Sequence, residues 1–411
     1  MYDFAAMWDW VGFAVRWLHV ITAIAWVGSS FYFIALDLGL RRVATPGALA
    51  DGEEWQVHGG GFYHIQKYMV APDNLPEHLT WFKWESYVTW LSGAALLMIV
   101  YWAGADLYLI DPAVAVLSTL QAILISTGSL TIGWIVYDLL CRSPLADRPT
   151  ALMLLLFVLL VLMAWGYAHV FTGRAAMLHL GAFTATIMSA NVFFNIIPNQ
   201  KIVVADLKAG RKPDPRYGKE AKLRSTHNNY LTLPVLFLML SNHYPLAFAT
   251  EYNWLIAALV FLMGVTIRHY FNTLHAGKGN LLWLWAITAA LFVGVMWLST
   301  APMFKSRGED TTAALTESQQ RYAAADGFAA VRETAGARCV MCHMREPVWD
   351  GVTWPPKGVL LESDRDIIVH ARQIYLQAGL SHAMPPANVS AISREERARI
   401  VDWYEAARRG G

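Results

Sequence analysis

The sequence predicts an all-α membrane protein, in which a polytopic helix bundle is followed by a smaller helical domain. Composition is the first observation: the 411 residues are 56% hydrophobic and only 15% charged, whereas soluble domains carry about 25% charged residues. Distribution is the second, because nearly all long apolar runs lie before residue 303 and the remainder is polar. The formal net charge of +1 gives no electrostatic reason to expect a nucleic-acid partner.

About eight membrane spans are predicted, because a helix needs about 20 mostly apolar residues to cross a bilayer. The candidates are residues 11–38, 84–103, 113–140, 150–172, 176–199, 228–248, 253–275 and 280–301. The segment 228–248 is the weakest, since asparagine and histidine interrupt it, and a seven-span bundle is the alternative. The first segment has neither a basic leader nor a small-residue cleavage site, so it is interpreted as a permanent span.

The distribution of Lys and Arg predicts the orientation of these spans, because cytoplasmic loops carry the excess of positive charge. With eight spans, one side collects most of these residues, from Arg41 to Lys278. The other side has only Arg16, Arg174, Lys305 and Arg307. The first side is therefore predicted to be cytoplasmic, and both termini are predicted to lie outside.

Three segments follow from the apolar pattern. We expect an integral membrane domain over residues 1–303, a linker over 304–317 and an extracytoplasmic domain over 318–411. The linker is recognised by its Gly, Asp, Thr and Ala composition, which is typical of a flexible tether.

The strongest motif lies in the C-terminal domain and reads Cys339-Val340-Met341-Cys342-His343. Two thiols at this spacing can each form a thioether to a haem vinyl group, and the imidazole can then bind the iron. The alternatives are a redox dithiol or half of a zinc site. No second pair of cysteines or histidines completes a zinc site, so the motif predicts one covalent haem c.

The sixth ligand of that iron is predicted to be Met384, which precedes two prolines; His382 and Met344 are weaker candidates. Helices are expected at about 316–334 and about 393–409, the latter with Ser393 as N-cap and Glu396 as its capping-box partner. The domain therefore resembles a class I-like cytochrome c. Bacteria attach such haem on the outer face of the inner membrane, which agrees with the predicted periplasmic side.

Four histidines are predicted in the outer halves of four spans, where ionisable residues are costly and usually functional. They are His19, His169, His179 and His243. Paired imidazoles across a bundle can hold a haem b, with Arg16 and Arg174 at its propionates and His19 and His179 as the preferred iron ligands. The alternatives are interhelical hydrogen bonds for the histidines and snorkelling for the two arginines.

A second polar group is predicted at the cytoplasmic ends of three spans. It consists of Asn191 and Asn195, then His227, Asn228 and Asn229, then Arg268, His269 and Asn272. Such a set of amides, imidazoles and one guanidinium would suit a planar anion with many hydrogen-bond acceptors, although ordinary polar helix ends are the alternative. Three glycines at 59–61 permit a tight hairpin or a close approach of the backbone to a ligand.

The chain as a whole resembles the membrane-bound urate hydroxylases, the cytochrome c-linked urate oxidases of bacterial purine degradation. The likeness is carried by residues 16–20 (RWLHV), 59–63 (GGGFY), 81–85 (WFKWE), 191–200 (NVFFNIIPNQ), 227–230 (HNNY) and 241–245 (SNHYP), followed by the cytochrome domain. The resemblance implies oxidation of urate with water to 5-hydroxyisourate. It also implies that electrons pass to cytochrome c and then to a soluble cytochrome or terminal oxidase, rather than to O2.

The residue types are compatible with that chemistry. Urate is an anion at neutral pH, so Arg268 and neighbouring amides could hold it, while His227 or His269 could accept a proton or activate water. Two alternatives remain: a quinol or porphyrinogen oxidoreductase that feeds the cytochrome domain, and a channel or transporter with a haem redox sensor. The sequence does not predict the oligomeric state.

Overall fold

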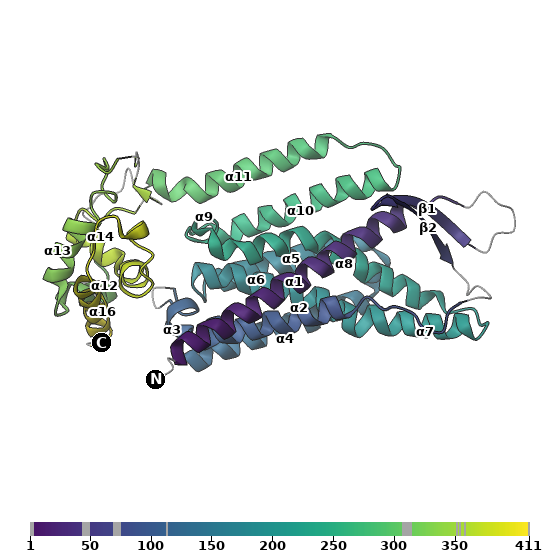
Figure 1. Cartoon of the computed structure of the whole chain (residues 1–411), viewed down its shortest axis with the longest axis horizontal. Coiled ribbons are helices and arrows are strands. Elements are labelled where there is room, and N and C mark those ends of the chain that lie inside the picture. Colours follow the sequence, from purple (N-terminus) through teal and green to yellow (C-terminus); the bar gives the residue numbers. More distant parts are fainter. Residues whose placement is uncertain are drawn as a thin grey trace. The chain divides into compact units, whose positions relative to one another are not determined.

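The computed structural model describes residues 4–42, 50–68, 75–111, 114–305, 315–350, 352, 355–356 and 359–409. The chain forms two compact units, Met1–Thr300 and Ala301–Gly411 (Figure 1). Most of the linker expected at 304–317 lies outside the described residues.

The first unit is a bundle of helices with short connections. Its α-helices are α1 (Phe4–Gly39), α2 (Trp84–Leu96), α3 (Ala105–Tyr108), α4 (Thr119–Arg142), α5 (Pro149–Ala168), α6 (Gly173–Ala190), α7 (Ile197–Lys208), α8 (Pro215–Leu240), α9 (Pro245–Phe248), α10 (Asn253–His275) and α11 (Trp283–Lys305). Two π-helical turns continue α2 and α6: η1 (Leu97–Trp102) and η3 (Asn191–Ile196). Short 3-10 turns are η2 (Pro144–Asp147) and η4 (Ser241–His243).

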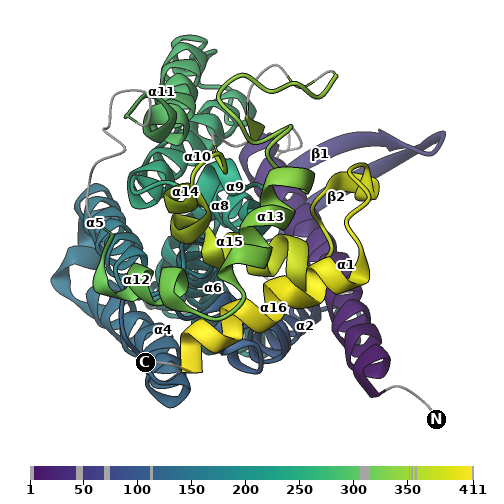
Figure 2. The ribbon, with the colours of Figure 1, turned by 90° about the vertical axis from the view of Figure 1, so that its left-hand side faces the viewer.

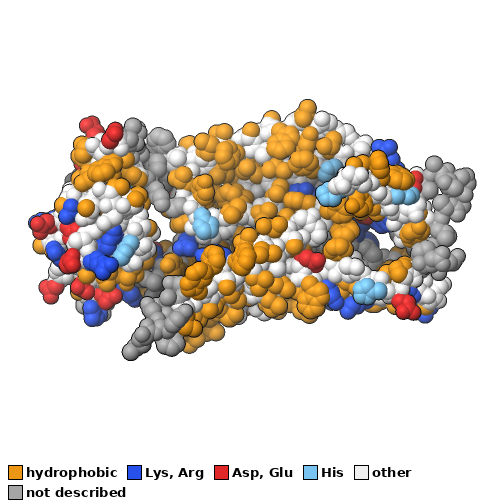
Figure 3. Space-filling model, viewed as in Figure 1, with side chains coloured by type: hydrophobic (Ala, Val, Ile, Leu, Met, Phe, Trp, Pro, Cys, Tyr) orange, Lys and Arg blue, Asp and Glu red, His pale blue; other side chains and the backbone are white. Residues whose placement is uncertain are grey.

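Six helices in the described part of the chain are long and apolar enough to cross a membrane, so the chain is a membrane protein. They are α1, α4, α5, the continuous helix α6–η3–α7, α10 and α11. In Figure 3 apolar side chains cover the middle of the first unit, while charged side chains gather mainly toward the end that carries the hairpin. Such a belt suits contact with lipid.

The other two predicted spans, 84–103 and 228–248, are largely helical but are not among these six candidates. The boundary predicted for the second was wrong, because α8 begins at Pro215 and ends at Leu240. The first half of α8 is polar. Its N-cap is Asp214, whose side chain accepts a hydrogen bond from the Arg216 backbone N–H at 2.8 Å. A search for apolar runs cannot detect a helix that begins in polar sequence.

The prediction of an entirely helical chain needs one correction. Strands β1 (Ala50–His58) and β2 (Gly61–Tyr68) form an antiparallel hairpin. Gly59 and Gly60 make its turn with φ of 59° and 80°, a region that suits glycine. The hairpin is fastened to the end of α1 by the Lys67–Asp37 ion pair and by the Tyr32 hydroxyl, which donates to Gln56 at 2.8 Å.

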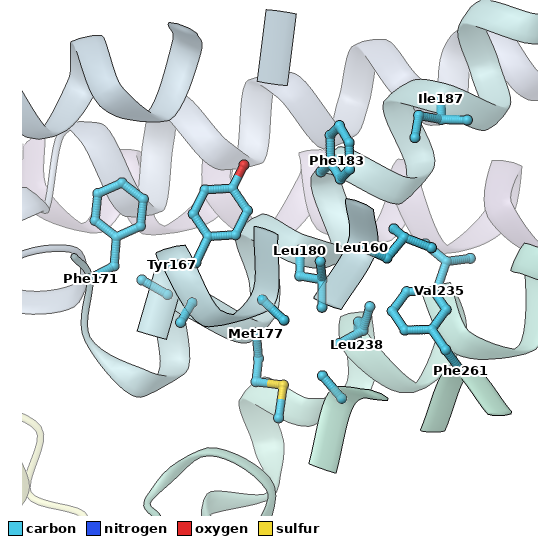
Figure 4. Close-up of a cluster of buried hydrophobic side chains, with 14 of the residues drawn as sticks. Leu160, Tyr167, Phe171, Met177, Leu180, Phe183, Ile187, Val235, Leu238 and Phe261 are labelled. Carbon is cyan, nitrogen blue, oxygen red and sulfur yellow. The ribbon is translucent and has the colours of Figure 1, made fainter. Parts of the chain in front are cut away.

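Helix α6 lies at the centre of the first unit and contacts α4, α5 and α8. Its buried side chains Leu180 and Phe183 belong to the same hydrophobic cluster as Leu238 of α8 and Phe261 of α10 (Figure 4). Close helix contacts depend on small residues, as membrane bundles often require. The tightest one described between α8 and α10 places Gly264 against the ring of Pro234.

The second unit contains α12 (Glu317–Ala324), α13 (Phe328–Arg338), α14 (Asp364–Val369), α15 (Ala371–Ile374), the π-helical turn η6 (Tyr375–Leu380), the 3-10 turn η7 (Pro386–Asn388) and α16 (Arg394–Arg409) (Figure 2). The helix expected at about 316–334 is therefore two helices. Gly327, with φ of 92°, separates them, since few other residues adopt that conformation.

The predicted start of the last helix is confirmed. The Ser393 hydroxyl accepts from the Glu396 backbone N–H at 3.1 Å, and the Glu396 carboxylate accepts from the Ser393 N–H at 2.6 Å. This helix packs its fully buried Trp403 against α12, where the indole N–H donates to the Tyr322 carbonyl at 2.9 Å. Tyr404 stacks on Tyr375, with ring centroids 4.1 Å apart.

Replacement of Gly264 by alanine is expected to destabilise the membrane unit. The added methyl would lie 2.5 Å from Pro234 Cδ, and overpacking of this kind costs about 1–3 kcal/mol. The Tm of the detergent-solubilised protein should fall. Gly166→Ala is the matched control, because no heavy atom lies within 4 Å of its added methyl. A fall for Gly264→Ala no larger than for Gly166→Ala would contradict the described packing.

Candidate functional site

A buried polar network joins α4, η3 and α8. The Tyr137 hydroxyl lies 2.8 Å from His227 Nδ1. Asn191 Nδ2 donates to that hydroxyl at 2.9 Å and to Asn228 Oδ1 at 3.0 Å, and Asn228 Nδ2 donates to the Met188 carbonyl at 2.9 Å. All four polar side chains are buried. Because unpaired polar groups are costly there, these bonds hold the three segments in one arrangement.

An ion pair lies directly beside this network. Arg224 is 2% exposed, and its Nη2 lies 2.6 Å from Asp138 Oδ1. Its Nη1 donates to Asn191 Oδ1 at 3.2 Å, and the guanidinium lies over the Tyr137 ring at 5.1 Å from the centroid. Asp138 has a second partner in Arg142, which donates from Nε at 2.6 Å. The buried charge of Arg224 is thus balanced by a carboxylate.

A second network lies between α1, α8 and α10. Arg268 donates from Nε to Asn229 Oδ1 at 3.4 Å and from Nη2 to Asn272 Oδ1 at 3.2 Å. Asn272 Nδ2 also donates to Asn229 Oδ1, at 2.9 Å. The Arg268 guanidinium lies 4.2 Å from the centroid of the Phe31 ring and is buried, the residue being 6% exposed. Within the described ranges no Asp or Glu forms an ion pair with it, in contrast to Arg224.

The two networks are separate because successive helical residues point about 100° apart. His227 faces α4, Asn228 faces η3 and the end of α6, and Asn229 faces α10. The single cluster that the sequence predicts is therefore divided by α8. Since the three residues lie within one helical turn, both networks occur at the same level along α8.

Three buried side-chain nitrogens on η3 and α8 have no hydrogen-bond partner among the described residues. They are Asn195 Nδ2, His227 Nε2 and Asn229 Nδ2. Burial of such a group without a partner costs free energy, and each case in a native protein requires an explanation. These atoms are positions that a bound ligand or water can satisfy.

His269 does not join either network. Its ring is exposed, and its Nδ1 lies 3.1 Å from the Tyr230 hydroxyl. The side chain follows Arg268 in sequence but points away from it, as the helical period requires.

The four outer histidines have different surroundings, and no hydrogen bond joins any two of them in the described chain. His179 is fully buried: Nδ1 donates to the Ala175 carbonyl at 2.8 Å, so Nε2 is the acceptor for the Ser126 hydroxyl at 2.8 Å. Both of its nitrogens are engaged by protein. His169 and His243 are exposed.

His19 is half-buried against α2. Its Nδ1 donates to the Thr89 carbonyl at 3.0 Å, which leaves the lone pair on Nε2. A methyl on Gly93 would lie 3.0 Å from its Cε1, so glycine makes room for the ring. Of the two predicted arginines, Arg16 is exposed, whereas Arg174 lies over the Tyr108 ring at 5.0 Å from the centroid.

The cysteine motif forms a tight turn after α13. The backbone N–H groups of Cys342 and His343 both donate to the Cys339 carbonyl, at 3.2 and 3.0 Å. Both cysteines are free, and burial raises the pKa of Cys339 to about 11, so its thiol is protonated at neutral pH. Burial lowers the pKa of His343, and its Nδ1 donates to the Val359 carbonyl at 3.0 Å. Its Nε2 lone pair is therefore free for another partner.

Met384 is half-buried and lies in the segment after η6. Its backbone N–H donates to the Gln377 carbonyl at 2.8 Å. Its competitors are placed differently: His382 is exposed and Met344 immediately follows the motif. Across the part of the chain that the structure describes, no group of three or more His, Cys, Asp or Glu side chains is arranged to hold a metal ion.

Sequence reasoning missed the partners that complete these networks: Phe31, Ser126, Tyr137, Asp138 and Arg224. Asp138 could have been recognised, since an acidic residue inside an otherwise apolar span is costly and needs a partner. Arg224 was counted only as a loop charge because α8 was expected to begin after it. Phe31 and Tyr137 look like any other aromatic residue in a span.

The fold and these networks define a polytopic helical membrane protein with buried polar centres and a separate cysteine-bearing unit. A family model described as urate oxidase N-terminal matches residues 5–299. The chain belongs to this family, which links it to the oxidation of urate. The match covers the first unit and ends beside its last residue, Thr300. No curated protein and no solved structure gave a significant match.

Loss of either partner of the Arg224–Asp138 pair should destabilise the protein by about 3–5 kcal/mol. Asp138→Asn should be the more damaging, because Arg224 would keep no carboxylate, whereas Asp138 in Arg224→Met keeps Arg142. Thermal or denaturant unfolding in detergent measures the difference. The exposed pair Lys219–Asp147 is the control, and its loss should change stability far less because solvent screens it. Equal costs for the buried and exposed pairs would contradict this account.

Proposed function

We propose that this chain is a membrane-bound urate hydroxylase. It oxidises urate with water to 5-hydroxyisourate, releasing two electrons and two protons, and the electrons leave through a covalent haem in the C-terminal unit. Family membership supports the substrate. The arrangement of buried polar groups and the cysteine motif support the remaining steps.

The proposal rests on the buried guanidinium of Arg268, which has no carboxylate partner among the described residues. A buried cation without a carboxylate is costly, and an anionic ligand removes that cost. Its neighbour Asn229 offers an unpartnered amide nitrogen, and the guanidinium lies over the face of the Phe31 ring, which helps to fix its position. A planar anion with several carbonyl oxygens could bind both the guanidinium and the amides of Asn229 and Asn272. Urate has these properties.

Two of the predicted substrate ligands fit a supporting role better. The side-chain amides of Asn191 and Asn228 are engaged by protein groups, so they position Tyr137 and His227. Asn195, with its free and buried Nδ2, remains a candidate for direct contact with a ligand.

The reaction releases protons, and His227 is the candidate base. Its ring is fully buried, its Nε2 has no partner, and the Tyr137 hydroxyl at Nδ1 orients the ring. An imidazole held in this way can accept a proton. Because His227 faces α4 whereas Asn229 faces α10, a proton from urate at Arg268 would reach it through an intervening water or polar side chain rather than directly. His269 is the exposed alternative.

The C-terminal unit is proposed as a cytochrome c domain. When bound, a c-type haem supplies a one-electron acceptor. The donor set fits such a group: Cys339 and Cys342 are free thiols on one turn, His343 keeps the Nε2 lone pair, and Met384 supplies a thioether. A soluble cytochrome or a terminal oxidase would take the electrons onward.

A haem b in the membrane unit stays a prediction. The surroundings of His179 do not fit an iron ligand, because both ring nitrogens already have protein partners. His19 fits better, since its anchored Nδ1 and available Nε2 match the usual arrangement of a ligating histidine. No step of the proposed reaction depends on this group.

The proposed location is the bacterial inner membrane, with eight spans and both termini outside. Covalent haem attachment on the periplasmic face and the excess of Lys and Arg on the opposite side favour the same orientation. The helices α2 and α8 would supply the spans beyond the six that length and hydropathy identify.

Addition of urate to the purified full-length protein should produce the absorption bands of ferrous haem c. The double variant Cys339→Ser/Cys342→Ser should still bind urate but should fail to reduce an added cytochrome. A pyridine haemochrome spectrum gives the amounts of haem c and of haem b per chain in one measurement. Reduction by a quinol or porphyrinogen, with no response to urate, would reject the proposal in favour of another oxidoreductase.

Arg268→Met should weaken urate binding by about 10-fold to 100-fold, because hydrogen bonds to a charged group are worth more than neutral ones. Arg268→Lys keeps the charge and should lose less. Equilibrium binding measured in detergent tests this. Arg211→Met changes an exposed arginine that follows α7 and is the control. Unchanged affinity for urate in Arg268→Met would place the substrate elsewhere.

A further inference from the structure

One buried arginine of the C-terminal unit holds the segment that carries Met384. Arg397 lies on α16 and is 6% exposed. Its Nη1 donates to the backbone carbonyls of Ala378 and Met384, at 2.6 and 2.8 Å, and its Nη2 donates to Asn388 Oδ1 at 3.1 Å. A single guanidinium therefore binds the segment before Met384, Met384 itself and the segment after it.

The segment needs such anchors because its backbone is unfavourable. Four of its non-glycine residues have left-handed φ values of 49° to 54°, namely His382, Ala387, Asn388 and Ala391. Side chains disfavour that region, so tertiary contacts must stabilise it. Most of the segment 381–391 is also exposed and buries few side chains that could hold it.

Two further contacts converge on the same place. Asn388 accepts at Oδ1 from the Ile392 backbone N–H at 3.1 Å and donates from Nδ2 to the Ile392 carbonyl at 3.2 Å. Gly379 of η6 packs on α16, where an added methyl would lie 3.1 Å from Val401 Cγ2. Helix α16 thus contacts the segment before Met384 at Gly379 and, through Arg397, the segment after it at Asn388.

The segment also contacts the residue that precedes the cysteine motif. Arg338 lies directly before Cys339, and it donates from Nη1 to the Ser390 carbonyl and from Nε to Glu396 Oε1, both at 3.1 Å. The haem-attachment turn therefore lies beside the segment that carries Met384 and beside α16, on which Arg397 lies.

We infer that Arg397 is a positioning residue that keeps Met384 on the haem iron and thereby sets the reduction potential at which electrons leave the protein. The inference rests on the proposed covalent haem. Without the guanidinium the left-handed segment loses its central anchor, and the thioether leaves the iron more easily. Since a thioether ligand favours the ferrous state, the midpoint potential should then fall.

The test uses full-length Arg397→Met. Covalent haem should remain, while the weak red absorption band that marks His/Met ligation should be reduced or lost and the midpoint potential should drop. The affinity of the ferric protein for added imidazole, which competes with Met384, should rise by about 10-fold to 100-fold, in line with the loss of hydrogen bonds from a charged group. Arg397→Lys keeps the positive charge but not the several N–H donors of a guanidinium. Its imidazole affinity should lie between those of the unchanged protein and Arg397→Met.

Arg332→Met is the control, because Arg332 is exposed and pairs only loosely with Asp364 at 3.4 Å. The mutation should change neither the band nor imidazole binding. If Arg397→Met folds poorly, imidazole affinity is instead compared among Arg397→Lys, Met384→Ala and the double variant. Once Met384 is absent, the Arg397 mutation should have no further effect on imidazole affinity.

The outcomes separate the two proposals. Full-length protein without covalent haem would overturn the proposed function. Covalent haem together with wild-type band, potential and imidazole affinity in Arg397→Met would overturn the positioning role alone.

Discussion

Hydrogen bonding of three consecutive residues on α8 determines how the membrane unit is assembled. His227, Asn228 and Asn229 carry polar groups into a bundle where no bulk water can solvate them, so each must find its partner on another helix. The bonds reach Tyr137 on α4, Asn191 on η3 and Arg268 with Asn272 on α10. Helix packing by apolar contacts alone would allow many arrangements, and these bonds favour one of them.

The two buried arginines of this unit illustrate how charge can serve different purposes. Arg224 is closed within protein groups and has a carboxylate beside it, which suits a structural role. Arg268 is surrounded by amides and an aromatic ring, so its positive charge remains available to a ligand. The same residue type therefore supports the scaffold on one side of α8 and, in the proposed function, recognition of the substrate on the other.

Much of the fold could be predicted because long apolar helices and local caps are encoded by adjacent residues. The capping box at Ser393 and Glu396 is an example, and so is the glycine turn of the hairpin. The start of α8 could not be predicted from apolar runs. The break at Gly327 was missed because a single glycine outweighed the helix-forming residues around it.

The candidate site was only partly predictable for a different reason. Residue types at the ends of spans indicated His227, Asn229 and Arg268, but a sequence does not state which helices become neighbours. The division into two networks depends on the angular position of each side chain around α8, and the partners Tyr137 and Phe31 come from helices far away in sequence.

The π-helical turn η3 interrupts a continuous helix of 36 residues from Gly173 to Lys208. Its defining bond runs from the Ile197 N–H to the Val192 carbonyl, five residues back. Such a turn accommodates one extra residue in an α-helix. Deletion of one residue between 192 and 194 would return this turn to ordinary α-helix, and because the wide turn absorbs the extra residue locally, the helix after it would keep nearly its present orientation relative to α6. A deletion in the regular part of the helix would instead rotate everything after it by about 100°. The turn is therefore the place where this helix can change its length by one residue without turning the buried Asn195 away from the interior.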